Sequence, residues 1–232
     1  GLEMVLRHGM RVNRYIYADT SESAQKVMRH RLTLLSGRYP HLLAPEAWEK
    51  AFETLPMDVY DISGTDLAAA VQQGEQWLVV AGWECQDLSP AGGGKGLKGN
   101  RSSTYFQLLR VLDGVQGAAK AKGNPPVGYL LENTAFQYHW SPEVAGRDFA
   151  AVCDVLGTPL EVDAARFGSR AHRLRNYWTN LGEPSKLAAA VTCAERPPGL
   201  TVQQILEHGR SPMPVVYASR PPWYPCNKVG QP

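Results

Sequence analysis

The chain has 232 residues, of which 44% are hydrophobic and 20% are charged, and its formal net charge is +2 at pH 7. This composition is typical of a soluble globular core, and no apolar run is long enough to cross a bilayer. The small net charge excludes a protein that binds nucleic acid by bulk charge alone, because such domains are far more basic. The first residues, GLEMVLRHGM, lack the apolar stretch and cleavage site of a signal peptide.

The chain has four cysteines: Cys85, Cys153, Cys193 and Cys226. They are far apart, and none lies in a Cys-x-x-Cys pair or in a Cys/His spacing typical of zinc, so no metal site is expected. A disulfide framework is not expected at this density. The sequence therefore predicts a reducing, intracellular compartment. A lone cysteine is usually a small buried hydrophobe, so only sequence context can single one out.

The first half of the chain alternates strand-like and helix-like patterns. Three runs read as β-strands: residues 13–19 (NRYIYAD), 57–63 (MDVYDIS) and 76–83 (QWLVVAGW). The last of these is continuously apolar, as expected of a buried parallel strand. Residues 20–35 carry apolar side chains at helical spacing, with Thr20 or Ser21 as the candidate N-cap and Gly37 as the candidate end.

The second half continues the alternation after a glycine-rich loop. Two segments predict helices, residues 103–115 and 146–157, and residues 117–126 predict a loop between elements. Three runs read as strands: residues 127–134, 158–168 and 175–182. The Pro-rich remainder holds one capped helical segment, residues 201–209.

Strands that alternate with helices predict an α/β fold with a mostly parallel sheet. In such a sheet, ligands bind outside the carboxyl ends of the strands. Four chemically capable side chains fall near the ends of predicted strands: Asp19, Asp61, Cys85 and Glu132. This coincidence is the first reason to consider Cys85 as a nucleophile, although an ordinary core thiol stays the alternative at this point.

The segment GWECQDLSPAGGGKGLKGNRS, after the third predicted strand, resembles the nucleophile loop of the C5-cytosine DNA methyltransferases. In that family a Pro-Cys-Gln element ends a strand and supplies the nucleophile, and the matching residues here are Cys85 and Gln86. Further residues fall where the family loop carries similar ones: Ser89, Gly92, Gly96 and Arg101. The agreement of many positions together makes this loop a specific signal.

Other elements resemble the same family in the same order. ENT, residues 132–134, is similar to its Glu-Asn-Val element, and AHRLR is similar to its Gln-x-Arg-x-Arg element, with Arg173 and Arg175 in place and Ala171 where Gln is expected. Upstream, YIYADTSESA resembles the second cofactor strand, with Asp19 at its acidic position. YDIS resembles the third cofactor strand, with Asp61 and Ile62.

The resemblance covers residues 1–182 and implies a partial catalytic core with a Rossmann-like, S-adenosylmethionine-dependent methyltransferase fold. The family's first strand and its glycine loop have no counterpart in the sequence. The Pro-rich residues 183–232 are interpreted as the start of a target-recognition region. The chain is therefore expected to be a middle piece of a methyltransferase.

The resemblance also implies a reaction in which Cys85 attacks C6 of cytosine and Glu132 stabilises the charge that develops at N3. The activated C5 then takes the methyl group of S-adenosyl-L-methionine. Arg173 and Arg175 would hold the base or the loop by charge-assisted hydrogen bonds. Because the base is inaccessible inside a stacked duplex, the expected partner is DNA with a flipped cytosine.

Binding roles follow from the same resemblance. Asp19 would accept hydrogen bonds from the cofactor ribose, and Asp61, with Ile62, would bind the adenine. A second set would contact the DNA: Gln86, Ser89, Lys95, Lys98 and Arg101. No membrane partner is expected, and the sequence identifies no protein partner. The resemblance implies an intracellular location, nuclear in a eukaryote or cytoplasmic in a bacterium.

Two alternatives stay open at this point. The first is a non-catalytic remnant or DNA-binding module, because Glu84 stands where the family has proline. A carboxylate there disfavours the thiolate, and it lacks the fixed backbone of proline. The second is a tRNA cytosine-5 methyltransferase, since that branch also carries Pro-Cys-Gln and Glu-Asn elements.

Overall fold

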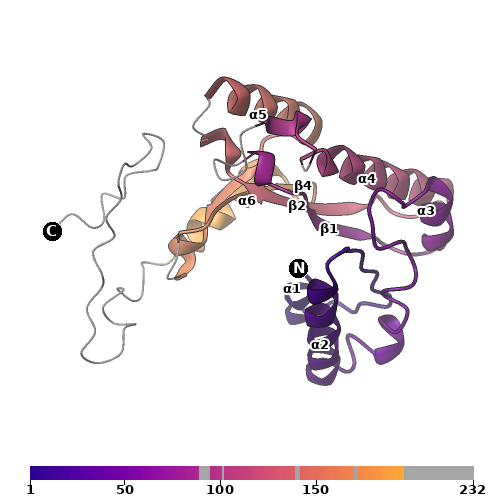
Figure 1. Ribbon diagram of the computed structural model, residues 1–232. Coiled ribbons are helices and arrows are strands. Elements are labelled where there is room, and N and C mark those ends of the chain that lie inside the picture. The colour runs from indigo at the N-terminus through magenta and orange to yellow at the C-terminus, as the bar shows by residue number, and fades with distance from the viewer. Residues whose placement is uncertain (89–94, 101, 139–141, 170–171, 196–232) are drawn as a thin grey trace. The chain divides into compact units, whose positions relative to one another are not determined.

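The computed structural model describes residues 1–88, 95–100, 102–138, 142–169 and 172–195 (Figure 1). These residues belong to two compact units. The first contains residues 1–80 and 106–127, and the second contains residues 81–105 and everything from residue 128 onward. The expected helix at 201–209 lies outside the described residues.

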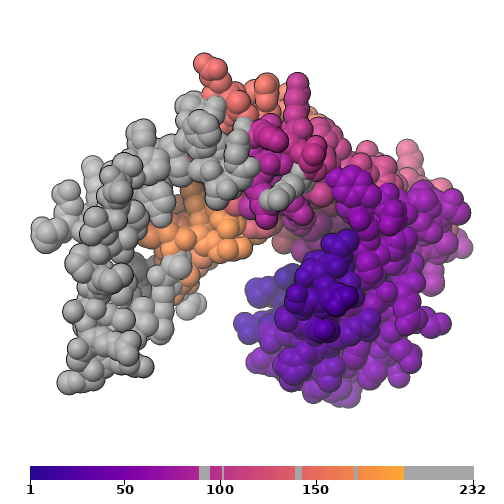
Figure 2. Space-filling view, viewed as in Figure 1, coloured from indigo at the N-terminus to yellow at the C-terminus, as the bar shows by residue number. Residues whose placement is uncertain are grey.

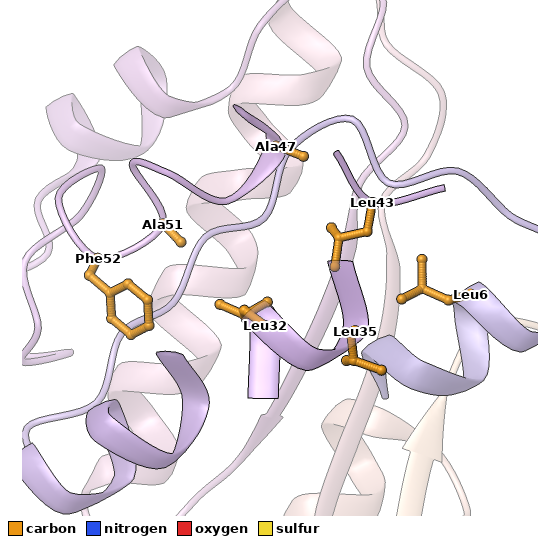
Figure 3. Close-up of a cluster of buried hydrophobic side chains, with 7 residues drawn as sticks. All are labelled: Leu6, Leu32, Leu35, Leu43, Ala47, Ala51 and Phe52. Carbon is orange, nitrogen blue, oxygen red and sulfur yellow. The ribbon is translucent and has the colours of Figure 1, made fainter. Parts of the chain in front are cut away.

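The first unit contains helices α1 (Leu2–Arg7), α2 (Glu22–Arg38) and α3 (Gly64–Ala70), together with most of α4 (Thr104–Ala121). Its core is a cluster of buried side chains that point toward one another in Figure 3: Leu6, Leu32, Leu35, Leu43, Ala47, Ala51 and Phe52. The surface that α1 and α2 contribute to this unit is the indigo region of Figure 2.

The expected strands at 13–19 and 57–63 are wrong, because neither segment pairs with a partner strand among the described residues. Backbone N–H groups of Val12, Tyr15 and Tyr17 donate to a segment of turns that includes the 3₁₀ helix Pro45–Ala47, and this partner is too irregular for a strand. At 57–63 the chain turns, since Asp58 accepts the backbone N–H groups of Tyr60 and Asp61.

Helices α2 and α3 of the first unit begin at side-chain caps. Ser21, one of the two expected N-caps, accepts a hydrogen bond from the Ala24 backbone at 3.3 Å, but α2 runs through Gly37 to Arg38. Helix α3, which the sequence pattern did not predict, begins at a capping box formed by Ser63 and Asp66.

Helix α4 is longer than the predicted 103–115 and includes part of the expected loop at 117–126. Alanines 118, 119 and 121 favour the helix. The helix ends at Ala121. Gly123, two residues further on, has a φ of +69° and precedes an Asn124 N–H bonded to the Ala119 carbonyl. This is the glycine-terminated helix end that satisfies the last carbonyl groups.

The sheet has four strands in the order β1-β2-β4-β3, with β1 at Leu78–Gly82, β2 at Gly128–Thr134, β3 at Leu160–Asp163 and β4 at Leu174–Thr179. Strand β4 is antiparallel to both β2 and β3. Strands β2 and β3 therefore run in the same direction, and β4 makes the expected mostly parallel sheet a mixed one. The α/β class is confirmed, and the arrangement is consistent with a Rossmann-like methyltransferase fold.

Two strands differ from their predicted form. Strand β1 is at one edge of the described sheet, so Leu78 and Val80 are 41% and 50% exposed instead of buried. The predicted strand at 158–168 is shorter, because Asp163 caps the 3₁₀ turn Ala164–Phe167 and Gly168 ends that turn at a φ of +87°.

The second unit also contains α5 (Pro142–Leu156), which begins four residues before the predicted helix, and α6 (Pro184–Cys193), which was not predicted. An aromatic cluster forms its core: Trp83, Tyr105, Phe136, Phe149 and Trp178. No helix in the described part of the chain has both the length and the apolar character needed to span a membrane.

Candidate active site

Cys85 lies three residues beyond the end of β1 and is half-buried. The backbone around it is held at three points. The Trp83 carbonyl accepts a hydrogen bond from Asn133 Nδ2 at 3.0 Å, the Glu84 N–H donates to Thr104 Oγ1 at 3.2 Å, and the Cys85 carbonyl accepts from Leu88 N at 3.0 Å. The candidate nucleophile is therefore attached to a fixed backbone.

Aromatic side chains pack around Trp83 and hold the segment that leads to Cys85. The Trp83 ring lies 5.2 Å from the Tyr105 ring and 5.3 Å from the Trp178 ring, measured between centroids. Trp83 is 7% exposed and Trp178 is not exposed at all. Because tightly packed aromatic rings resist displacement, the end of β1 is rigid two residues before Cys85.

Glu132 and Arg175 are brought together by the antiparallel pairing of β2 and β4. Glu132 is directly opposite Tyr177, so Arg175, two residues away along β4, is on the same face of the sheet. Arg175 Nε lies 2.9 Å from Glu132 Oε1. The guanidinium also donates from Nη1 to the Leu174 carbonyl at 2.7 Å, which fixes its orientation.

The Glu132 side chain lies against β1. A Cβ atom on Gly82 would lie 3.2 Å from the Glu132 carbonyl oxygen and 3.3 Å from Glu132 Oε2. The absence of a side chain at residue 82 therefore lets the carboxylate approach the strand that leads to Cys85. Two of the predicted catalytic residues, Glu132 and Arg175, thus meet at this end of β1.

Arg173 is exposed and is not part of this ion pair. Its backbone N–H donates to Asp163 Oδ1 at 2.9 Å, and the same carboxylate bonds Ala165 N at 3.0 Å and His172 Nδ1 at 2.8 Å. Burial opposes ionisation of Asp163, but the bonds from His172, Ala165 and Arg173 outweigh it and lower its pKa. Asp163 therefore holds the segment that leads into Arg175.

The predicted cofactor residues Asp19, Asp61 and Ile62 all belong to the first unit, whereas Cys85 and Glu132 belong to the second. Asp19 Oδ1 accepts from Ser21 N at 2.8 Å, and Oδ2 accepts from the Tyr17 hydroxyl at 3.3 Å. Burial, helped by the Asp19 charge, raises the pKa of Tyr17 to about 12. Asp19 thus also has a structural role, because it accepts a hydrogen bond from the N-cap residue of α2.

Asp61 is exposed, and Ile62 next to it is 3% exposed. Asp19 and Asp61 share a position in their elements, because each precedes a serine N-cap by two residues: Ser21 for α2 and Ser63 for α3. Both carboxylates therefore lie beside the start of a helix, where backbone N–H groups favour negative charge.

The predicted DNA contacts are only partly described. Gln86 and Lys95 are exposed, as a contact with a large ligand requires. Ser89 and Arg101 lie outside the described residues, as do Gly92 and Ala171. No cluster of potential metal ligands occurs in the described ranges.

Asn133 was not singled out by the sequence, although it is 2% exposed and bonds the Trp83 carbonyl. The feature that could have indicated its role is its place in the apolar run VGYLLENT, because a buried amide group needs specific hydrogen-bond partners. Asp87 and Asp148, two further buried carboxylates, were also missed, because nothing in the sequence shows which acids are buried.

No protein-family profile matches the chain. Over 102 residues, 42% of this chain and 25% of the relative, it is 34% identical to the type II methyltransferase M2.BsuMI of Bacillus subtilis (strain 168). Over 147 residues, 61% of this chain and 32% of the relative, it is 26% identical to the type II methyltransferase M.HgiCI of Herpetosiphon aurantiacus. The chain spans about a quarter to a third of these curated relatives, and it is distantly related to type II methyltransferases.

Proposed function

We propose that the chain belongs to a DNA (cytosine-5-)-methyltransferase, which transfers a methyl group from S-adenosyl-L-methionine to C5 of cytosine through a covalent adduct with Cys85. The observation that carries the proposal is the ion pair of Glu132 and Arg175, 2.9 Å apart, against Gly82 of the strand that leads to Cys85. The similarity to two type II methyltransferases supports methyl transfer.

Cys85 supplies the nucleophile. Its thiolate forms a bond to C6, and the electrons of the C5=C6 double bond shift through the ring toward N3, which makes C5 nucleophilic. After C5 is methylated, loss of the C5 proton restores the double bond and expels the thiolate. The reaction thus begins and ends with the same enzyme residue.

Glu132 acts at N3, where its carboxyl group shares a proton with the ring nitrogen and so stabilises the charge that develops there. Arg175 keeps the carboxyl group in place through the Nε contact, while its own position is fixed by the Leu174 carbonyl. We assign to Arg173, which is exposed, a contact with the DNA or with the base rather than with Glu132.

S-adenosyl-L-methionine supplies an electrophilic methyl group when it is bound. The residues of the first unit fit its polar part, because Asp61 is exposed and Asp19 uses only two of about four lone-pair positions of its carboxylate. Asp19 would accept the ribose hydroxyl groups, and Asp61, with Ile62 beside it, would accept the adenine amino group.

DNA is the proposed partner, with the target cytosine flipped out of the duplex because Cys85 cannot reach C6 in a stacked base. Gln86 and Lys95, both exposed, would contact the DNA around the flipped base. Such an enzyme works in the compartment that holds the DNA, so we expect an intracellular location.

The test is methyl transfer by the protein encoded by the complete open reading frame that contains this chain. With labelled S-adenosyl-L-methionine and duplex DNA, nucleoside analysis should find the label in 5-methylcytosine. Glu132→Gln should lower the rate by about a hundredfold or more, as expected for loss of a general acid. Glu143→Gln, an exposed control on α5, should have no effect. Label in another base, or in tRNA but not in DNA, would contradict the proposal.

A non-catalytic DNA-binding module is the second candidate, and Glu84 favours it. Glu84 is exposed next to Cys85, and its backbone N–H is bonded to Thr104 Oγ1. Because proline has no N–H, Glu84→Pro would break this bond, so Glu84→Gln is the cleaner variant. The binding module would be supported if the unmodified protein and the Glu84→Gln variant both bind DNA but neither forms 5-methylcytosine.

A further inference from the structure

Two glycines beyond Cys85 leave space that buried carboxylates occupy. A Cβ atom on Gly96 would overlap the carboxylate of Asp148, and a Cβ atom on Gly99 would overlap that of Asp87. Gly96 also has a φ of +69°, which other residues rarely adopt. Residues 95–100, called here the return segment, therefore need glycine at both places to lie against these acids.

Both carboxylates are bonded to backbone N–H groups of the chain that follows the two glycines. Asp148 Oδ2 accepts from Leu97 N at 2.7 Å, and Asp87 Oδ2 accepts from Ser102 N at 3.4 Å. Asp148 is 4% exposed and Asp87 is 7% exposed. The 3₁₀ turn Gly96–Lys98 contacts both the turn Gln86–Leu88, which follows Cys85, and helix α5.

Because Asp148 is buried, the hydrogen bonds that its carboxylate accepts determine which conformations are favourable. A buried carboxylate is costly unless it is hydrogen-bonded, so Asp148 favours only those conformations in which Leu97 N is in place. Its other partner, Arg147 at 2.9 Å, is half-exposed, and an exposed ion pair of this kind contributes little. The bond to Leu97 is therefore the contact that selects the position of the return segment.

We propose that Asp148, together with Asp87, is a positioning residue that holds the return segment beside the turn after Cys85 and so presents Lys95 and Lys98 to the DNA backbone. Both lysines are exposed, which leaves their charge available to a phosphate. The part of this inference that concerns DNA rests on the proposed function, whereas the part that concerns the return segment does not.

The first experiment measures cleavage after Lys95 and Lys98 by a lysine-specific protease, with the fragments identified by mass spectrometry. Asp148→Ala should speed cleavage at these two bonds about tenfold, because cleavage follows local opening. Asp148→Asn keeps an oxygen that accepts from Leu97 N and should stay close to the unmodified chain. Gly96→Ala, which displaces the carboxylate, should behave like Asp148→Ala.

Two matched variants serve as controls. Asp154 is an exposed aspartate on the same helix, and a Cβ atom on Gly146 would have no neighbour within 4 Å. Asp154→Ala and Gly146→Ala should both leave the cleavage rate unchanged. The proposal is overturned if Asp148→Ala does not speed cleavage, or if Asp148→Asn opens the segment as much as Asp148→Ala does.

The second experiment measures the affinity of the same chain for a fluorescent DNA duplex by anisotropy. Asp148→Ala and Lys98→Gln should each weaken binding several-fold, and the double variant should be no weaker than the worse single one, because both changes remove one contact. Additive losses would overturn the DNA part. Absence of DNA binding by the unmodified chain would also overturn the DNA part, while the cleavage rates still decide the role of Asp148 and methyl transfer by the protein from the complete open reading frame decides the proposed function.

Discussion

Asn133 and Asn176 are a natural matched pair at the scale of single residues. They are directly opposite each other on β2 and β4, and they are 2% and 0% exposed. Their amide groups bond in different directions: Asn133 Nδ2 donates to the Trp83 carbonyl, whereas Asn176 exchanges two hydrogen bonds with Gln137. Of these two asparagines, Asn133 is the one whose side chain bonds β2, the strand of Glu132, to the segment that leads to Cys85.

Replacing each asparagine with alanine should separate stability from positioning. Both variants should lose about 1–3 kcal/mol of unfolding free energy, because each removes a buried amide group together with its hydrogen bonds. Only Asn133→Ala should change the rate at which iodoacetamide alkylates Cys85, measured by peptide mass spectrometry. Equal alkylation rates in the two variants would show that Asn133 is an ordinary core residue.

Asp163 determines a pH dependence of stability. Its pKa is lowered in the folded chain, where hydrogen bonds from His172, Ala165 and Arg173 outweigh the effect of burial. A carboxyl group with a lowered folded-state pKa stabilises the fold above its unfolded value of about 3.9, and this stabilisation is lost as the pH falls through the folded-state value.

Asp163→Asn should therefore be less stable than the unmodified chain at pH 7, and the difference should shrink as the pH falls below about 4. Urea unfolding at pH 7, 5 and 3 measures it. Asp154→Asn, an exposed control, should show no pH-dependent difference. A difference for Asp163→Asn that stays constant over this range would mean that the lost interaction does not depend on its charge.

At the scale of elements, the close packing of α3 and α4 depends on one glycine. A Cβ atom on Gly114 of α4 would overlap Leu67 Cδ1 of α3, and Leu67 is 1% exposed. Gly117, one turn further along α4, would have no neighbour within 4 Å. The two glycines therefore differ in packing but not in secondary structure.

Gly117→Ala should raise the unfolding free energy by up to about 1 kcal/mol, because alanine favours the helix. Gly114→Ala gains the same preference but displaces a buried leucine, which costs about 1–3 kcal/mol. Thermal or urea unfolding of both variants measures the difference. If Gly114→Ala is as stable as Gly117→Ala, the contact between α3 and α4 is looser than described.

The sequence predicted the strands that carry the candidate site better than those of the first unit. Strands β1 and β2 follow from apolar runs, and a ladder partner is available for each of β1, β2 and β4. Residues 13–19 and 57–63 have similar patterns, but their hydrogen bonds go to turns and side chains. Periodicity reports which residues favour a strand, and it does not report whether a partner strand exists.

The site was predictable in part for the same reason. Motif order identified Glu132 and Arg175 as members of one site, and the register of β2 and β4 places them in contact. Asn133, Asp87 and Asp148 could not be predicted, because their roles depend on burial and on backbone groups distant in sequence. Glu84 was judged by its charge and by the loss of proline's fixed backbone, whereas the structure also uses its backbone N–H as a hydrogen-bond donor.

At the scale of the whole molecule, the candidate residues divide between the two units. The acidic residues proposed to bind the cofactor belong to the first, and the nucleophile with Glu132 and Arg175 belongs to the second. Strand β1 and helix α4 each continue from one unit into the other, so the units share two elements.

Formation of a covalent bond between Cys85 and cytosine is the central claim, and DNA that contains 5-fluorocytosine tests it most directly. Fluorine at C5 cannot leave as a proton does, so the proposed adduct should be trapped after methyl transfer. The protein from the complete open reading frame should form a complex with this DNA that survives denaturation, and Cys153→Ser should form it as well. Cys85→Ser should form none. A trapped complex that persists in Cys85→Ser, or its absence in a protein that does produce 5-methylcytosine, would contradict the mechanism.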